Sequence, residues 1–261
     1  MTGLRVAMLR SDAPHNEYHA DVLQNRFDVV AMVVEPGAEQ RRALRVRRRW
    51  VDYSAALYHD TRRSVSGLSA YRRNYFADRP HVPTERRAAI HRVSTVNDPA
   101  VRHLLHEARP DVTVVTCTTV LTPQTIAAAA GPILNVHGGY LPDYRGWYGF
   151  FFALYDLAFD KIGSTIHFID TGIDTGDIVE VVQPTIYPDD GPEQLYCRAE
   201  RLAVHRLMDL LAGLERGHPL PRQPQSYRRR LYRRRDRTPY HDIVFALRRR
   251  NSRIVLPDST R

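Results

Sequence analysis

The sequence predicts an α/β fold with a doubly wound, mostly parallel β-sheet, a helical insertion and a short C-terminal extension. In the N-terminal half, short apolar runs alternate with segments of helical spacing. This alternation is typical of a parallel sheet covered by helices. The alternation is interrupted over about residues 39–92 and again after residue 220, where arginines and tyrosines become frequent. These two interruptions mark the expected insertion and extension.

The first elements follow one another closely. A strand is expected over 4–9, where Leu-Arg-Val-Ala-Met-Leu is a short apolar run. A helix is expected over 17–26, because Tyr18, Val22 and Leu23 recur near helical spacing. The apolar run over 27–34 predicts a second strand, which ends before Pro36 and Gly37.

The alternation resumes after the interruption. Val101, Leu104 and Leu105 fall on one face of a helix expected over 99–108, and an apolar strand is expected over 111–116. An alanine-rich helix over 123–130 precedes a buried strand over 133–136. Asn135 and His137 fall at the carboxyl end of this last strand, which is where doubly wound sheets bind their ligands.

The segment over about 39–92 is expected to be a basic helical insertion within a catalytic domain that spans 1–220. Residues 43–58 predict a basic amphipathic helix. Either its arginines are solvated, or they contact an anionic substrate or a membrane surface. Interleaved aromatic residues and arginines also suit nucleic acid, but no nucleic-acid module is recognisable, and such a partner is not expected.

The C-terminal part begins with a helix expected over 193–214, whose leucines form an apolar stripe. Packing on the sheet is expected, with a homodimer face as the alternative. An arginine-rich extension over 221–261 follows, with a short apolar helix over 243–247. Its arginines over 227–250 are either a solvated surface or a site for phosphate, which arginine binds bidentately.

Composition bounds the class of protein. The chain has 261 residues and a formal net charge of +9, and Lys161 is its only lysine. The positive charge favours anionic partners. Two cysteines, Cys117 and Cys197, do not make a disulfide framework. With no signal peptide or membrane helix expected, a reduced, cytoplasmic protein is predicted.

Two polar motifs carry the candidate chemistry. Asn135-Val-His137 is followed by a Leu-Pro-Asp-Tyr-Arg-Gly loop that ends at Gly146. A second histidine, in Thr-Ile-His167, precedes Asp174 by seven residues. An amide donor, an imidazole and a carboxylate are the groups needed to move an acyl group onto an amine.

Together these motifs resemble the folate-dependent formyltransferase family, firmly over 111–182 and weakly over the N-terminal sheet. The family includes glycinamide ribonucleotide, methionyl-tRNA and sugar N-formyltransferases. The resemblance implies a Rossmann-like sheet, an enzyme, and 10-formyltetrahydrofolate as the co-substrate. It implies that Asn135 and a protonated His137 donate to the developing oxyanion. Asp174 would hold the tautomer of His137, raise its pKa and accept the amine proton.

The resemblance also implies binding residues. The pterin is expected in a backbone slot near 116–123, faced by the loop 170–174, and Cys117 in this segment is expected to be a small buried residue. The expected cofactor-binding residues are Thr119, Val120, Leu121, Asp170 and Ile173. The expected substrate-binding residues are Gly139, Tyr144, Arg145 and His167. Packing is the alternative for Tyr144, and a place in the core is the alternative for His167. No metal is expected.

Departures from the family pattern narrow the substrate. Residues 10–16 lack the glycines of a phosphate loop, which argues against glycinamide ribonucleotide. About forty residues follow Pro221, too few for the C-terminal barrel of the methionyl-tRNA enzymes. Gly139 replaces a common serine, and with Trp147 and Tyr148 the pattern is closer to the sugar-modifying branch. An amino sugar on a nucleotide is therefore the preferred substrate. An amino-acid-derived or natural-product amine or hydroxylamine remains an alternative, as does a non-catalytic binder of anionic ligands or nucleic acid.

Overall fold

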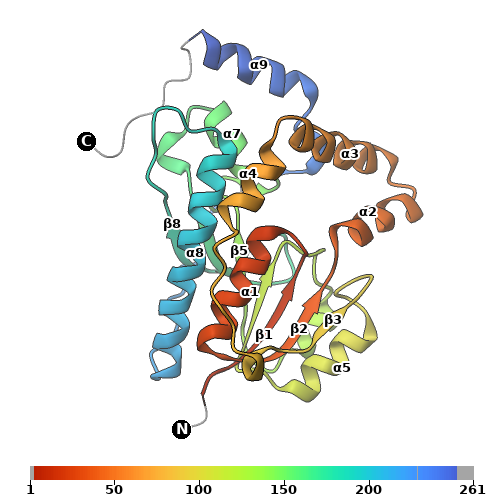
Figure 1. Ribbon diagram of the computed structural model, residues 1–261, viewed down its shortest axis with the longest axis vertical. Helices are drawn as coiled ribbons and strands as arrows, with labels where there is room; N and C mark the ends of the chain where they lie inside the picture. The colour runs from red at the N-terminus through yellow and green to blue at the C-terminus, as the bar shows by residue number, and fades with distance from the viewer. Residues whose placement is uncertain (1–2, 228, 252–261) are drawn as a thin grey trace.

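A seven-stranded sheet forms the centre of the computed structural model, which describes residues 3–227 and 229–251 (Figure 1). The strand order is β3-β2-β1-β4-β5-β7-β8. The first five of these strands are parallel, and β7 and β8 are antiparallel to their neighbours. The strands are β1 (Arg5–Arg10), β2 (Asp28–Val34), β3 (Ile90–Arg92), β4 (Val112–Thr116), β5 (Ile133–His137), β7 (Ser164–Phe168) and β8 (Ile178–Val182). The predicted doubly wound, mostly parallel sheet is confirmed.

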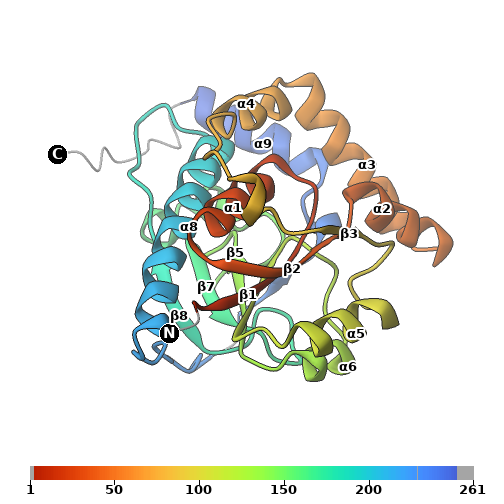
Figure 2. The ribbon, with the colours of Figure 1, turned by 60° about the horizontal axis from the view of Figure 1, so that its bottom comes forward.

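Helices cover both faces of the sheet (Figure 2). On one face lie α1 (Pro14–Arg26) and α8 (Pro192–Glu215), and on the other lie α5 (Pro99–Ala108) and α6 (Pro123–Ala128). Side chains of a strand alternate between faces. Val6 and Met8 of β1 therefore pack toward α8, while Ala7 and Leu9 pack toward α5. Leu195, Leu207 and Leu211 of the apolar stripe of α8 are buried within the monomer, as expected, whereas Leu202 is exposed. A homodimer stays a prediction.

Outside the insertion, the predicted elements match the observed ones within a few residues. The helix expected over 17–26 begins earlier, at Pro14, because proline suits the first turn of a helix, where its missing N–H is not needed. The helix expected over 123–130 ends at Ala128. Because β1 pairs with β2 on one side and β4 on the other, the strand order reverses between β1 and β4. Doubly wound sheets bind ligands at such a point.

The insertion contains three helices: α2 (Gly37–Val46), α3 (Trp50–Val65) and α4 (Leu68–Tyr75). The prediction of one helix over 43–58 is wrong. Arg48 adopts a left-handed backbone with φ of 54°, and this conformation ends one helix before the next begins. The last residues of the expected insertion belong to the sheet, since β3 pairs with β2. A 3₁₀ turn, η1 (Thr84–Arg86), precedes β3.

The C-terminal extension folds back over the carboxyl edge of the sheet. Its strand β9 (Leu231–Tyr232) pairs with β6 (Arg145–Gly146), and a 3₁₀ turn, η3 (Arg234–Asp236), leads to α9 (Pro239–Arg250). The ring centroid of Phe245 on α9 lies 5.2 Å from that of Phe151 on α7 (Gly149–Tyr155). Helices α3 and α4 of the insertion lie at the same end of the molecule as α9 (Figure 1), and the Tyr58 hydroxyl of α3 donates to Asp242 of α9.

The remaining short element is a 3₁₀ turn, η2 (Phe159–Lys161), before β7. Residues 252–261 of the expected extension, together with residues 1–2 and 228, lie outside the described part of the chain. No helix in the described part is long and apolar enough to cross a membrane.

Candidate active site

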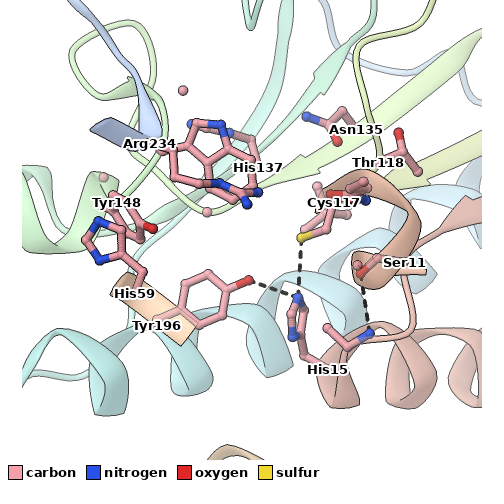
Figure 3. A pocket seen from close by; sticks show the side chains of 18 of the residues that line it. Ser11, His15, His59, Cys117, Thr118, Asn135, His137, Tyr148, Tyr196 and Arg234 are labelled. Atoms are coloured by element: carbon pink, nitrogen blue, oxygen red, sulfur yellow. Dashed lines mark hydrogen bonds between the residues drawn. The ribbon is translucent and has the colours of Figure 1, made fainter. Parts of the chain in front are cut away.

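A cavity of about 680 Å³ opens at the carboxyl edge of the parallel strands (Figure 3). The segments after β1, β4, β5 and β7 contribute to its lining, so it lies at the reversal point of the sheet. Residues of the insertion and of η3 complete the lining. The polar side chains of Asn135, His137, His167 and Asp174 all reach this cavity, and we refer to these four as the floor.

Strand pairing brings Asn135 and His167 together, because they stand opposite each other on the neighbouring strands β5 and β7. Nδ1 of His167 donates to the carbonyl oxygen of Phe168 at 2.8 Å. Its Nε2 therefore accepts a hydrogen bond from the Asn135 amide, at 3.0 Å. Burial lowers the pKa of His167 to about 4, in keeping with a neutral ring. One amide hydrogen of Asn135 is thereby used, and the other has no partner among the described residues.

His137 ends β5 with its ring next to Asp174. Nε2 of His137 donates to the carbonyl oxygen of Tyr144 at 3.0 Å. Its Nδ1 lies 3.7 Å from Oδ2 of Asp174, and Nε2 of His167 lies 3.7 Å from Oδ1 of the same carboxylate. Both distances exceed a hydrogen bond. The carboxylate thus lies between two imidazoles, and the tautomer of His137 is set by the Tyr144 carbonyl rather than by Asp174.

Asp174 is held in place by its backbone and by a neighbouring strand. Its φ is 51°, a left-handed conformation that aspartate tolerates better than most residues. Its Oδ2 accepts a hydrogen bond from the Gly146 backbone N–H at 2.8 Å. Gly146 itself has φ of 86°, and a Cβ there would lie 2.1 Å from the carbonyl oxygen of Tyr232. Only glycine fits, and through Tyr232 the extension contacts the strand that holds Asp174.

All five residues expected to bind the cofactor line the cavity: Thr119, Val120 and Leu121 after β4, and Asp170 and Ile173 after β7. The two segments are fixed internally. The backbone N–H and the hydroxyl of Thr119 both donate to the buried carboxylate of Glu35, at 2.7 and 2.9 Å. Asp170 accepts from the Gly172 backbone N–H at 2.9 Å and from the Thr175 hydroxyl at 2.6 Å. The two segments form a preformed slot.

Of the four expected substrate-binding residues, His167 lines the cavity and Gly139, Tyr144 and Arg145 do not. The side chain of Tyr144 is buried, and its hydroxyl lies 3.3 Å from Asp156, so the packing alternative holds. The guanidinium of Arg145 donates to the Ile173 carbonyl at 2.6 and 3.1 Å. A Cβ on Gly139 would lie 2.7 Å from Nε2 of His137. These residues therefore support the floor and the loop next to it through contacts outside the cavity lining.

Seven of the described arginines line the cavity as well. Arg62 and Arg237 both pair with Asp242. We refer to the other five as the arginine wall: Arg41, Arg63, Arg72, Arg73 and Arg234. Arg41 and Arg63 share Asp60, at 2.9 and 2.8 Å, and Arg72 pairs with Glu193 at 2.6 Å. Within the described residues, Arg73 and Arg234 have no carboxylate partner. Arg234 lies 3.9 Å above the Trp147 ring, and burial lowers its pKa.

A second polar cluster in the cavity lies beside this slot and has no signal in the sequence. Nε2 of His15 lies 3.4 Å from Sγ of Cys117 and 2.9 Å from the Tyr196 hydroxyl (Figure 3). The expectation that Cys117 is buried is wrong, because the residue is exposed to the cavity; its backbone is left-handed, with φ of 55°. Protein nevertheless surrounds the thiol within the cavity. Desolvation raises the pKa of this thiol and lowers that of His15. The thiol form is favoured, and this form is a poor nucleophile.

Comparison with known proteins identifies a family match. Residues 62–211 match the family model described as formyl transferase. A methionyl-tRNA formyltransferase from Syntrophus aciditrophicus is 33% identical over 133 residues, which are 50% of this chain and 42% of that protein. The chain therefore matches about two fifths of the length of such curated relatives.

Solved structures show the same fold. A sugar N-formyltransferase from a Shewanella species superposes with a TM-score of 0.58 at 15% identity, covering 94% of this chain and 87% of that one. A 4-N formyltransferase from Francisella tularensis gives a TM-score of 0.53 at 12% identity, covering 88% and 76%. These likenesses concern the fold, and the local chemistry rests on the residues described above.

Proposed function

This chain belongs to the formyl transferase family, and we propose that it is an enzyme that transfers a formyl group from 10-formyltetrahydrofolate to the amine of an amino sugar carried on a nucleotide. The observation that carries the proposal is the carboxylate of Asp174, which lies 3.7 Å from both His137 and His167. The same cavity holds the slot and the arginine wall. It therefore offers a place for the donor, a place for an anionic acceptor and a base between them.

The slot suits the folate co-substrate. Pockets of 300 to about 1,000 Å³ are usual for small molecules and cofactors, and this cavity of about 680 Å³ falls within that range. Thr119, Val120 and Leu121 would hold one side of the pterin, and Asp170 and Ile173 would hold the other. When bound, 10-formyltetrahydrofolate supplies the formyl group. The hydrogen bonds that Glu35 accepts from Thr119 and that Asp170 accepts from Thr175 would fix the two sides of the slot before the donor binds.

The floor supplies the groups that the transfer needs. As the substrate amine forms its bond to the formyl carbon, it loses a proton, and Asp174 is placed to accept that proton directly or through water. The bond between the formyl carbon and N10 of the donor would then break, and the proton taken up by Asp174 would pass to that nitrogen as tetrahydrofolate leaves. The free amide hydrogen of Asn135 can donate to the oxygen that gains negative charge, as can Nδ1 of His137 when it is protonated. His167 remains neutral and orients Asn135. None of these steps requires a covalent bond to the protein.

The arginine wall supports a phosphorylated acceptor. Arg73 and Arg234 are cations that line the cavity without a carboxylate partner in the described part of the chain. Guanidinium groups bind phosphate oxygens bidentately. A diphosphate between sugar and nucleoside would give these two cations the anion that they lack. Trp147 and Tyr148, in the same lining, offer aromatic surface to the rest of the nucleotide.

Two measurements test the proposal. Calorimetric titration with 5-formyltetrahydrofolate, a stable analogue of the donor, should show micromolar binding. Mass spectrometry should then detect a formamide product from nucleotide-linked amino sugars, and none from glycinamide ribonucleotide or methionyl-tRNA. Absence of folate binding would refute the formyltransferase assignment. Folate binding with formylation of methionyl-tRNA instead would refute the sugar substrate alone.

A further inference from the structure

The insertion and the extension carry an apolar face that is not part of the cavity lining. We call it the outer face, and it consists of Trp50, Val51, Leu57, Val65, Tyr240, Ile243 and Leu247. Each of these side chains is between 51% and 83% exposed. Large apolar side chains scattered singly on a surface need no explanation, but contiguous sets mark interaction sites. This set is confined to two helices, α3 and α9.

Helical spacing aligns the members of the set on each helix, and the two helices touch each other. On α3, positions 50, 54, 57, 61 and 65 recur at helical spacing, and none of them is charged. On α9, Tyr240, Ile243 and Leu247 recur in the same way. The two helices meet where the Tyr58 hydroxyl donates to Asp242 at 2.8 Å. A shallow groove along α3, lined by Leu57, Tyr58 and Val65 among others, adjoins that contact.

Every carboxylate on α2, α3 and α9 is already paired with an arginine. Asp52 binds Arg49 and Arg235, Asp60 binds Arg41 and Arg63, Glu39 binds Arg42, and Asp242 binds Arg237. The exposed side chains of Arg45, Arg47, Arg48 and Arg250 have no such partner among the described residues. The apolar stripes of α3 and α9 thus lie on helices that, together with α2, also carry unpaired arginines.

We propose that the outer face docks on the surface of an anionic lipid bilayer, with Trp50 and Leu57 in the interfacial region and Arg45, Arg47 and Arg48 over the headgroups. Helices with an apolar stripe and flanking arginines lie in this interface, and anionic lipid attracts each nearby cation. A second copy of the chain would bring the same unpaired arginines toward one another. Nucleic acid would satisfy the arginines and leave the apolar stripes in water.

Docking in this way would place the bilayer beside the cavity. The opposite side of α3 contributes Ala56, His59 and Asp60 to the cavity lining. One helix would therefore contact lipid with one side and the substrate cavity with the other. This inference does not depend on which amine is formylated.

The two tryptophans, Trp50 and Trp147, allow a direct test. In a Trp147→Phe variant of the full chain, Trp50 is the only tryptophan. Its emission should shift to shorter wavelength with vesicles of phosphatidylcholine and phosphatidylglycerol, and should not shift with phosphatidylcholine alone. Binding should weaken as salt rises, because salt screens exposed charges. An equal shift with both vesicle types, or none with either, would overturn the proposal.

Variants separate the two components of binding in cosedimentation with the same vesicles. Leu57→Ser combined with Ile243→Ser should weaken binding at least about tenfold, since each removes a side chain that transfers favourably out of water. Leu202→Ser is the matched control, because Leu202 is a half-exposed leucine on α8, away from the outer face. Arg45→Glu with Arg47→Glu should also weaken binding. Circular dichroism confirms that each variant is folded.

Two results would point to a different occupant and refute membrane docking. One is a wild-type dimer by light scattering that Leu57→Ser dissociates, together with no binding to vesicles. The other is binding of RNA at the salt concentration at which vesicles do not bind. Unchanged vesicle binding in both double variants would likewise refute the proposal. Formyl transfer on a soluble substrate should be unaffected by Leu57→Ser, since Leu57 does not line the cavity.

Discussion

The floor and the arginine wall share one cavity but are built in different ways. The four floor residues come from two paired strands and the loop that follows them, all within residues 135–174. They are largely buried and positioned by hydrogen bonds to backbone or to one another. The arginine wall draws on residues 41–73 and on Arg234, and aspartate and glutamate side chains hold much of it. Strand register therefore fixes the floor, whereas contacts between distant segments assemble the wall.

This difference suggests a division of tasks between the two regions. A buried environment from which water is largely excluded strengthens hydrogen bonds to a developing charge, which suits the floor to the chemical step. Arginines that contact solvent attract an anion but are screened by salt, which suits the wall to substrate selection. Changes in the floor should consequently reduce kcat, and changes in the wall should raise KM and do so in a salt-dependent way. Each prediction below tests one side of this division.

The largest effect is expected from Asp174→Asn. The amide keeps the shape of the side chain but cannot accept the amine proton, and loss of a general base lowers kcat by about 10²- to 10⁴-fold. Calorimetric binding of 5-formyltetrahydrofolate should change little. The surface variant Asp209→Asn, on α8, serves as the control. If kcat survives in Asp174→Asn, the base is another group and the mechanism given for the floor is incorrect.

The floor could be predicted because its residues are near one another in sequence and follow a recognisable pattern. A strand that ends at His137 places both Asn135 and His137 at the carboxyl edge, whatever the rest of the chain does. The place of Thr119, Val120 and Leu121 in the cavity lining was predictable for the same reason, since they follow the neighbouring strand β4. The sequence does not reveal that Gly139, Tyr144 and Arg145 support the site from behind. That outcome depends on which way the loop turns its side chains.

The arginine wall could not be predicted in detail, although the arginine-rich segments were evident. A sequence pattern cannot show that Arg234 lies in the same cavity lining as Arg41. The position of Arg234 depends on the pairing of β6 with β9 and on the packing of Phe245 against Phe151. The break at Arg48 was also hidden, because arginine is not a usual residue for a left-handed conformation. The contact between His15, in the first turn of α1, and Cys117, after β4, was hidden for a similar reason, because the two segments are far apart in sequence.

The second effect concerns the support beneath the floor. Glu200 is buried under the turn that follows His137, where it accepts a hydrogen bond from the Ser164 hydroxyl at 2.8 Å. Burial raises its pKa from 4.5 to about 7. The folded state thus holds this proton more tightly than the unfolded state does. Between pH 4.5 and 7 the contribution of Glu200 to the free energy of unfolding must therefore fall as pH rises, and the full cost, about 3 kcal/mol, applies above pH 7.

Glu200→Gln should remove that cost. Above pH 7 the variant is expected to unfold with a free energy about 3 kcal/mol higher than the wild type, and the two should converge near pH 4. Buried His19, whose pKa is lowered to about 4, acts in the opposite direction between pH 4 and 6.5. Nε2 of His19 lies 4.0 Å from the Glu200 carboxylate, so the substitution also changes the surroundings of His19. Above pH 6.5 His19 is neutral in both the folded and the unfolded state, and there the difference between the urea unfolding curves reports Glu200. A constant difference across pH would show that Glu200 does not titrate in this range.

The third effect tests whether the two regions are independent. Gly146 donates to Asp174 and pairs with Tyr232 of the extension. In Gly146→Ala the new methyl group would meet the Tyr232 carbonyl, so the extension must shift and Asp174 loses its donor. We expect kcat to fall about thirtyfold, and the melting temperature to drop because a left-handed alanine is strained. Gly217→Ala, also left-handed but open to space, controls for backbone strain alone. Equal loss of activity in both variants would contradict a link between extension and floor.

The smallest effect is expected from Arg234→Met, which keeps the apolar packing against Trp147 and removes the charge. The variant lacks the bidentate hydrogen bonds from this arginine to phosphate, at a site that solvent reaches. KM for a nucleotide-linked amino sugar should therefore rise about tenfold, which corresponds to roughly 1.4 kcal/mol of binding free energy. The variant should leave kcat and folate binding unchanged. Arg233→Met, an exposed neighbour outside the cavity lining, is the matched control. High salt should raise the wild-type KM toward that of Arg234→Met. If kcat falls instead, Arg234 acts on the chemical step and the division between floor and wall does not hold.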